Sequence, residues 1–235
     1  MARSFAHSII FFDLDGPLLD VSARYIALHQ QVLAEFGQQG LPGPTYWQRK
    51  RSRCSEESIL VEVGATAWTD SYVRQRLALI ESPEFLVHDR PWPWTHATLT
   101  QLRGVSSLVL VTARANRPML LEQLDRLGLA SFFHEILSTP AGLRVDEEKA
   151  VLIRDYLARH RYVATGHMMV GDTEADIGAG KLTGLRTAAV LSGIRNREFL
   201  LQAQPDWLLN DIRELPFRGV ECVAGPNCFD HKHPD

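Results

Sequence analysis

Short apolar runs that end abruptly in polar residues constrain the fold of this chain more than any other feature. The runs occupy 8–12, 107–111, 167–170 and 187–191, with weaker examples at 132–137 and 207–209. Continuous apolar runs of this length indicate strands buried on both faces, as in a parallel sheet. Helical patterns lie between the runs, and strands that alternate with helices predict βαβ units. We therefore expect an α/β fold with a mostly parallel sheet.

Two of the predicted helices have recognisable beginnings. Asn116 can cap one helix, with Pro118 in its first turn. Asp146 can cap another that runs through Lys149 to residue 156. Both helices follow predicted strands, which supports the alternating pattern.

The stretch 18–92 interrupts this alternation. Helical patterns occupy 22–36, 55–63 and 69–80, with a loop at 40–44, and Pro83 and the proline-rich segment 91–94 end helical structure. A helical block placed after the first strand predicts a second small domain. The expected domains are a core of residues 1–17 and 93–220, a helical insert of residues 18–92 and a loose tail of residues 221–235.

Composition excludes several classes of protein. Of the 235 residues, 45% are apolar and 23% charged, so the chain can bury a core and is not a disordered chain. The net charge of -3 gives no general attraction to nucleic acid or acidic membranes. Three cysteines are too few for a disulfide framework, and no apolar run approaches the roughly 20 residues that cross a bilayer. We expect a soluble cytoplasmic protein.

An acidic pair directly follows the first predicted strand. Asp13 and Asp15 are two residues apart, so both carboxylates face the same side of an extended chain. Ligands of open α/β sheets bind at the carboxyl ends of strands, where this pair lies. Gly16 lets the chain turn away sharply. Two carboxylates this close repel each other unless a cation lies between them, and such an oxygen-rich site suits Mg²⁺.

A second acidic group follows the predicted strand at 167–170. Asp172 stands at the strand end, and Asp176 lies one helical turn later on the same face. Acidic residues also complement a helix N-terminus, but that does not explain why both groups follow buried strands. The predicted metal-binding set is therefore Asp13, Asp15, Asp172 and Asp176.

Two further positions suit a phosphate. Thr112 ends the predicted strand 107–111, and Ala113 follows it. A hydroxyl and free backbone N–H groups at a strand-to-helix turn form a cradle for phosphate oxygens. Lys149 begins the helix before the strand that carries Asp172, where its ammonium can neutralise both a phosphate and a nucleophilic carboxylate.

In this order, the four elements resemble the four motifs of the haloacid dehalogenase (HAD) superfamily. They are Asp13-Leu14-Asp15-Gly16, then Thr112, then Lys149, then Gly171-Asp172-Thr173-Glu174-Ala175-Asp176. The resemblance covers about residues 8–18 and 93–212. It implies a Rossmannoid three-layer core, and the insert resembles the helical cap of the phosphoglycolate-phosphatase-like branch.

The resemblance also implies chemical roles. Asp13 would attack phosphorus as a nucleophile and form an aspartyl-phosphate. Asp15 would protonate the leaving oxygen and then activate water. Mg²⁺ would be held by Asp13, Asp172 and the backbone carbonyl of Asp15, with Asp176 supporting that shell.

The expected substrate is a small phosphorylated metabolite. Thr112, Ala113 and Lys149 would hold its phosphoryl group during transfer. The acid at Asp15 favours a phosphate ester over the dehalogenase and phosphonatase branches. A phosphosugar mutase shares the acid pair and stays open as an alternative. So does a receiver-type switch, in which a strand-end aspartate takes up a phosphoryl group as a signal, although receivers are about half as long and have no such insert.

Two other clusters stand apart from these motifs. Arg49, Lys50, Arg51 and Arg53 form a basic group in the insert. We expect Arg49 and Arg53 to read an anionic part of the substrate, although a solvated helix face is the simpler interpretation. Near the end of the chain, Cys222, Cys228, His231 and His233 match no common zinc-site spacing, so we interpret them as part of the tail.

Overall fold

The computed structural model describes residues 8–139 and 144–216. The predicted tail at 221–235, with its cysteine and histidine residues, lies outside this part of the chain. A six-stranded sheet forms the centre of the fold, in the order β5-β4-β1-β6-β7-β8. Its strands are β1 (Ser8–Phe12), β4 (Ser106–Thr112), β5 (Glu135–Ser138), β6 (Met168–Gly171), β7 (Arg186–Val190) and β8 (Trp207–Leu209). Every pairing between neighbouring strands is parallel, which confirms the predicted fold class.

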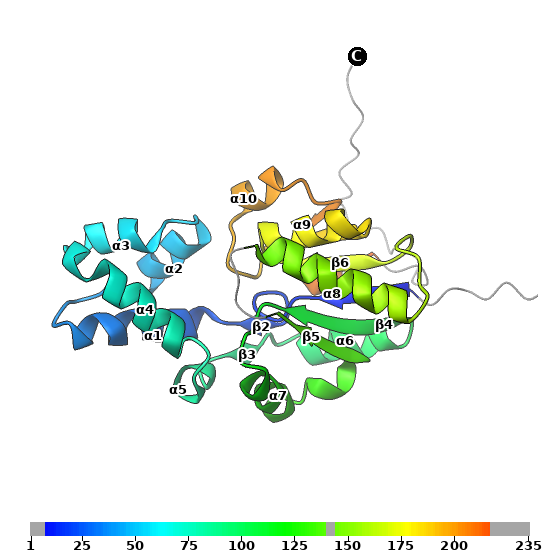
Figure 1. The fold of residues 1–235 in the computed structure, drawn as a ribbon, viewed down its shortest axis with the longest axis horizontal. Coiled ribbons are helices and arrows are strands. Elements are labelled where there is room, and N and C mark those ends of the chain that lie inside the picture. Colours follow the sequence, from blue (N-terminus) through cyan, green and yellow to red (C-terminus); the bar gives the residue numbers. More distant parts are fainter. Residues whose placement is uncertain (1–7, 140–143, 217–235) are drawn as a thin grey trace, which may run out of the picture.

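Helices cover both faces of this sheet (Figure 1). The helices are α6 (Thr95–Arg103), α7 (Arg117–Arg126), α8 (Val145–Arg159), α9 (Glu174–Thr183) and α10 (Arg197–Gln202). Because side chains alternate along a strand, Ile10 and Phe12 pack towards α6 and α7. Ile9 and Phe11 pack on the other face, towards α8 and α9. All four side chains are buried, which explains why residues 9–12 are all apolar.

The insert folds as a separate group of helices to one side of the sheet (Figure 1). We call residues 22–87 the helical unit; it contains α1 (Ser22–Glu35), α2 (Gly43–Arg51), α3 (Glu56–Glu62), α4 (Thr69–Leu79) and α5 (Pro83–Leu86). It has its own apolar core, in which Leu28, Leu60, Tyr72 and Phe85 are packed together. The chain enters and leaves the unit through β2 (Leu19–Asp20) and β3 (Arg90–Pro91), which pair antiparallel.

Three local predictions were wrong. The segment predicted as a loop at 40–44 contains the start of α2, and Pro83 begins α5 instead of ending helical structure. Both errors have one cause: proline lacks an N–H, but the first turn of a helix leaves N–H groups unpaired in any case. Asp146 lies inside the first turn of α8, where its charge complements the helix dipole, and Arg144 is the N-cap. Asn116 does cap α7, by accepting a hydrogen bond from Met119 N.

The order of the strands determines where a ligand can bind. The strand order reverses at β1: the chain places β4 and β5 on one side of it and then crosses from β5 to β6 on the other side. A crevice therefore forms at the carboxyl ends of β1, β4 and β6. In the described part of the chain, no helix combines the length and apolar character needed to cross a bilayer.

Candidate active site

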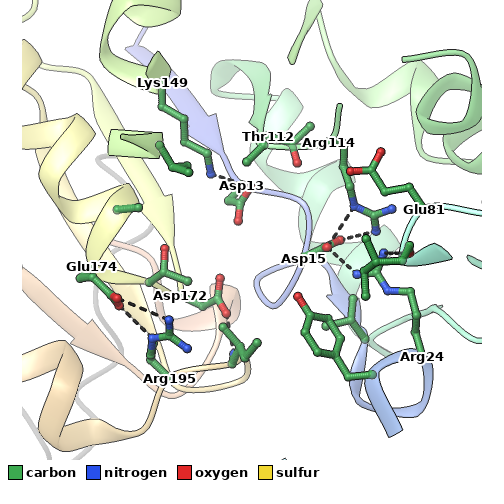
Figure 2. Close-up of a pocket in the computed structure, with 18 of the residues that line it drawn as sticks. Asp13, Asp15, Arg24, Glu81, Thr112, Arg114, Lys149, Asp172, Glu174 and Arg195 are labelled. Atoms are coloured by element: carbon green, nitrogen blue, oxygen red, sulfur yellow. Dashed lines mark hydrogen bonds and ion pairs between the residues drawn. The ribbon is translucent and has the colours of Figure 1, made fainter. Parts of the chain in front are cut away.

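A cavity of about 650 Å³ lies between the strand ends and the helical unit. That volume is within the usual range of roughly 300–1,000 Å³ for sites that bind small molecules. Figure 2 shows acidic and basic side chains pointing into it from both sides. The core contributes Asp13, Asp15, Thr112, Ala113, Arg114, Val145, Asp146, Lys149, Asp172, Thr173, Glu174, Ala175, Ile194 and Arg195. The helical unit contributes Arg24, Tyr25, Arg53, Arg76, Leu77, Ile80 and Glu81, and the adjoining Val21 also lines the cavity.

Asp13 stands at the carboxyl end of β1 and contacts a buried lysine. Lys149 Nζ lies 2.9 Å from Asp13 Oδ1 and 2.6 Å from Asp176 Oδ1. Oxygen atoms of Asp13, Asp172 and Asp176 all lie within 4.8 Å of one another. The structure therefore brings together four residues that the sequence singled out, from the ends of β1 and β6 and from α8 and α9.

Asp176 is anchored from several directions by the beginning of α9. Its Oδ2 accepts hydrogen bonds from Asp172 N, Thr173 N and Thr173 Oγ1, and its other oxygen binds Lys149. Thr173 and Asp176 form a capping box. Because both of its oxygens are hydrogen-bonded, the Asp176 carboxylate is held in place, and it in turn holds Lys149 and the turn at Asp172 and Thr173.

Glycine is required where the turn after β1 passes Asp172. Gly16 has a φ of +97°, and a Cβ there would lie 2.2 Å from Asp172 Oδ2. A larger residue would therefore displace the carboxylate or the loop. This close approach is what allows the two acidic motifs to share one site.

The electrostatics of this group favour a cation. Burial, together with the charges of Asp176 and Asp15, raises the pKa of Asp13 to about 7 despite the opposing effect of Lys149. Burial and the charges of Asp176 and Asp13 also raise the pKa of Asp172 well above its usual range. Asp172 Oδ1 is buried and has no hydrogen-bond partner within the described residues. This set of clustered carboxylates, with one oxygen that lacks a hydrogen-bond partner, fits Mg²⁺.

Asp15 has different partners. Arg114 binds both of its oxygens, through Nη2 at 2.7 Å and Nε at 3.0 Å, and Arg24 Nη2 lies 2.6 Å from Oδ2. Both arginines also contact the buried Asp89, at 3.1 Å from Arg114 and 3.2 Å from Arg24. Gln123 Nε2 donates a further hydrogen bond to Asp89 at 2.7 Å. Figure 2 shows the two guanidinium groups converging on Asp15.

This arginine–aspartate cluster favours the ionised form of Asp15. Burial would raise the pKa of Asp15, but Arg114 and Arg24 outweigh it and hold the pKa below its usual range. Sequence reasoning missed Arg24 and Asp89 altogether and did not assign a role to Arg114. The only signal was the position of Arg114, two residues after Thr112 at a strand end.

The predicted phosphate cradle lies at the cavity wall. Thr112 is buried at the end of β4, and Thr112 and Ala113 both line the cavity beside Arg114. Further along this turn, Glu81 of the helical unit accepts hydrogen bonds from Ala115 N at 3.0 Å and Asn116 N at 2.7 Å. The helical unit therefore contacts the core directly at the N-terminus of α7.

The two arginines expected to read the substrate are placed differently. Arg53 lines the cavity, and its Nε lies 3.1 Å from Glu174 Oε1, which Arg195 also binds. Two guanidinium groups thus share one carboxylate, which leaves a net positive charge there. Arg49 is not among the lining residues and pairs with Glu62 at 2.7 Å. The structure does not bring Arg49 to the site.

The fold and the four motif positions define an α/β core whose strand-end aspartates face a helical insert. The family model of the haloacid dehalogenase-like hydrolases matches residues 10–190. The chain belongs to this family. It is an enzyme, and the comparisons support phosphatase activity on a small phosphorylated substrate.

Curated relatives match almost the whole chain. A phosphoglycolate phosphatase from Synechococcus elongatus is 28% identical over 206 residues, which cover 88% of this chain and 94% of that protein. A phosphoglycolate phosphatase from Aquifex aeolicus is 30% identical over 79% of this chain and 85% of its own length. The pyrophosphatase PpaX from Bacillus pumilus is 28% identical over 88% of this chain and 93% of its own length.

Solved structures confirm the fold. A haloacid dehalogenase-like hydrolase from Streptococcus pneumoniae superposes with a TM-score of 0.70 at 21% identity, covering 88% of this chain and 96% of that one. A structure described as a putative β-phosphoglucomutase from Thermotoga maritima superposes with a TM-score of 0.63 at 18% identity, covering 88% and 95%. Structures described as a hydrolase and as a mutase therefore share this architecture, so the fold alone does not select the reaction.

Proposed function

We propose that this protein is a Mg²⁺-dependent phosphatase that hydrolyses a small phosphorylated metabolite through an aspartyl-phosphate on Asp13. The observation that carries the proposal is the placement of Asp13. Its carboxylate lines the cavity beside Lys149 at 2.9 Å and within 4.8 Å of the oxygens of Asp172 and Asp176. A nucleophile, a phosphate-neutralising cation and a set of metal-binding carboxylates are thus collected at one strand-end site.

The first half of the reaction transfers the phosphoryl group to the enzyme. An oxygen of Asp13 attacks phosphorus, a new P–O bond forms to Asp13, and the bond from phosphorus to the leaving oxygen breaks. Asp15, which must first take up a proton from solvent against the effect of Arg24 and Arg114 on its pKa, delivers that proton to the leaving oxygen. Thr112, the Ala113 backbone N–H and Lys149 hold the phosphoryl oxygens as negative charge shifts among them.

The second half regenerates the enzyme. Asp15, now ionised, takes a proton from a water molecule whose oxygen attacks phosphorus. The P–O bond to Asp13 breaks, the carboxylate of Asp13 is restored and inorganic phosphate leaves. The two guanidinium groups on Asp15 favour its ionised form and therefore favour this role as a base.

The carboxylates that would hold Mg²⁺ are Asp13 and Asp172, with the backbone carbonyl of Asp15 as a third donor and Asp176 as the group that positions them. A bound Mg²⁺ supplies positive charge that offsets the carboxylates and the phosphoryl group. Asp176 suits the supporting role because Lys149 and the start of α9 already engage both of its oxygens.

We also propose that residues 18–92 form a cap over a catalytic core of residues 1–17 and 93–220. The paired strands β2 and β3 are the two chain connections, so the cap can open and close about them. Contacts from Glu81 and Arg24 to the core support a closed arrangement in this structure. Closure excludes water before phosphoryl transfer, and opening releases the product.

The substrate class follows from the charges on the cap side. Arg53 and Arg195 share Glu174, so an anionic leaving group would find an unneutralised guanidinium beside it. Relatives named phosphoglycolate phosphatase and pyrophosphatase act on substrates that carry a second anionic group. We propose Arg53 as the substrate-reading residue, whereas the prediction for Arg49 lacks a contact with the cavity.

A released-phosphate assay tests this proposal. The purified chain is offered phosphoglycolate, pyrophosphate, sugar phosphates and para-nitrophenyl phosphate, each with Mg²⁺ and with excess chelator. We expect phosphate release that needs Mg²⁺ and is lost in Asp13→Asn, while the exposed Asp155→Asn control stays active. Isomerised sugar phosphate without net release would indicate a mutase, and one stable phosphorylation without turnover would indicate a receiver-type switch. Full activity in chelator would refute the metal assignment.

A further inference from the structure

The loop after β7 lies between the helical unit and the acidic site. It spans residues 191–196. Ile194 N donates a hydrogen bond to Asp172 Oδ2 at 2.5 Å, and Ser192 Oγ donates to Gly16 O at 3.0 Å. The loop therefore touches both turns that carry the catalytic and metal-binding aspartates.

One arginine of the helical unit holds this loop from the other side. Arg51, the last residue of α2, donates to Gly193 O at 2.7 Å, to Leu191 O at 2.9 Å and to Arg195 O at 3.2 Å. Asn196 N donates back to Arg51 O at 3.0 Å. These bonds attach the helical unit to the core at a place separate from its two chain connections.

A single peptide group links Arg51 to Asp172. The carbonyl of Gly193 and the N–H of Ile194 belong to the same planar peptide unit, in which they point in opposite directions. Arg51 binds the carbonyl and Asp172 binds the N–H. A rotation of this peptide plane that breaks one bond therefore disturbs the other, and hydrogen bonds in series strengthen each other.

Gly193 has no room for a side chain in this arrangement. A Cβ at this position would lie 1.9 Å from Asp172 Oδ2. The loop backbone thus lies directly against the carboxylate, so its position decides how Asp172 is oriented.

We infer that Arg51 is a positioning residue that couples docking of the helical unit to the metal-binding carboxylate of Asp172. When the unit is docked, the guanidinium fixes the 193–194 peptide and its N–H holds Asp172 Oδ2. This leaves Asp172 Oδ1, the buried oxygen without a hydrogen-bond partner among the described residues, available to a cation. When the unit undocks, the peptide and the carboxylate lose this restraint. The metal part of this inference rests on the proposed function; the peptide link does not.

Three variants of the full-length chain test the coupling. Arg51→Met removes the donors but keeps much of the side-chain volume. Arg51→Lys keeps the charge but not the planar fork that binds several carbonyls. Arg103→Met is the matched control, because Arg103 also donates to a backbone carbonyl, that of Ser131, but does not line the cavity.

Two readouts are measured on each variant: the Mg²⁺ dissociation constant by titration calorimetry, and hydrogen exchange at the Ile194 amide. We expect Arg51→Met to bind Mg²⁺ about tenfold more weakly, as for other groups that orient metal ligands, and to exchange Ile194 faster. Arg51→Lys should show a smaller effect in the same direction, and Arg103→Met none. The lysine variant also serves if the methionine variant does not fold.

Wild-type Mg²⁺ affinity in both Arg51 variants would overturn the inference, whatever happens to the exchange rate. So would an equal loss of affinity in Arg103→Met, because the effect would then be one of general stability. If the wild-type chain itself bound no Mg²⁺, the proposed function would fail. In that case unchanged exchange at Ile194 in the Arg51 variants would separately contradict the peptide link.

Discussion

Asp13 and Asp15 lie two residues apart, yet their carboxylates occupy opposite electrostatic surroundings. Burial and neighbouring carboxylates raise the pKa of Asp13 to about 7 although Lys149 opposes them. At Asp15, two guanidinium groups overcome the effect of burial and lower the pKa below its usual range. The difference fits two proposed roles: at Asp13 a bound cation would offset the cost of ionising a buried carboxylate, and at Asp15 the favoured ionised form suits the base that activates water.

The two surroundings also come from different parts of the chain. The partners of Asp13 lie on β6, α8 and α9 or the turns beside them, all within the core. The partners of Asp15 include Arg24 of the helical unit, and Asp89 next to β3 supports them. Displacement of the helical unit should therefore change the surroundings of Asp15 more than those of Asp13.

The largest expected effect is at Asp13, the proposed nucleophile. Asp13→Asn should abolish turnover of para-nitrophenyl phosphate, because the amide keeps the volume but cannot form the acyl phosphate. Steady-state kinetics measure the loss, and circular dichroism with thermal unfolding checks that the fold is retained. Appreciable turnover by this variant would mean that the covalent mechanism is wrong.

Asp15→Asn should be the next most damaging change. General acid–base catalysis is worth about 10²–10⁴-fold, so the rate should fall within that range. The loss should be greater for an alkyl phosphate than for para-nitrophenyl phosphate, because a poor leaving group needs the proton more. Comparing kcat/KM for the two substrates measures this difference. An equal loss on both would argue against a proton transfer from Asp15 to the leaving oxygen.

Breaking the support behind Asp15 should cost stability. Asp89 is fully buried and contacts Arg24 and Arg114, so Asp89→Asn leaves these guanidinium groups with less compensating charge. We expect the free energy of unfolding to fall by about 3 kcal/mol. The exposed pair of Arg159 and Asp155 provides the contrast, and Asp155→Asn should change it by less than about 1 kcal/mol. Denaturant titration measures both, and equal losses would contradict the comparison.

A smaller effect should appear in the pH dependence of stability without metal. The folded state raises the pKa of Asp13 from 3.8 to about 7, so between these values it binds more protons than the unfolded chain does. The free energy of unfolding should therefore decrease as pH rises through this window. Thermal unfolding in chelator, followed from pH 4 to pH 7, measures the decrease. It should be weaker in Asp13→Asn, and Mg²⁺ should reverse it at pH 7. A flat profile would contradict the raised pKa.

The part of the site around Asp13 could be predicted because its pattern is local. Asp13 and Asp172 each stand directly after a short apolar run, and parallel strands place their carboxyl ends at one edge. Lys149 was predicted from its order along the chain, and the structure brings its Nζ to 2.9 Å from Asp13. The strand predicted at 8–12 is found as β1, because a run of apolar side chains buried on both faces is a strong signal.

The surroundings of Asp15 could not be predicted, because they join residues that no local pattern connects. Arg114 is 99 positions away from Asp15 and Asp89 is 25 positions from Arg114, so only the folded chain brings them together. Arg51 was seen only as part of a basic cluster that suggested a solvated helix face. Its contacts depend on where α2 begins and on the loop at 191–196. The Gly-Pro sequence at 43–44, where α2 begins, had indicated a loop and not a helix.

Trapping of the covalent intermediate tests the central claim most directly. The chain is mixed with substrate and Mg²⁺, quenched with borohydride, digested and examined by mass spectrometry. Hydride reduces an acyl phosphate to the alcohol with loss of phosphate, so a phosphorylated aspartate becomes homoserine. With para-nitrophenyl phosphate, whose leaving oxygen has little need of a proton, the account predicts homoserine at position 13, more of it in Asp15→Asn, where hydrolysis of the intermediate is slowed, and none in Asp13→Asn. Homoserine at position 15 or 172, or at no position despite turnover, would contradict the account.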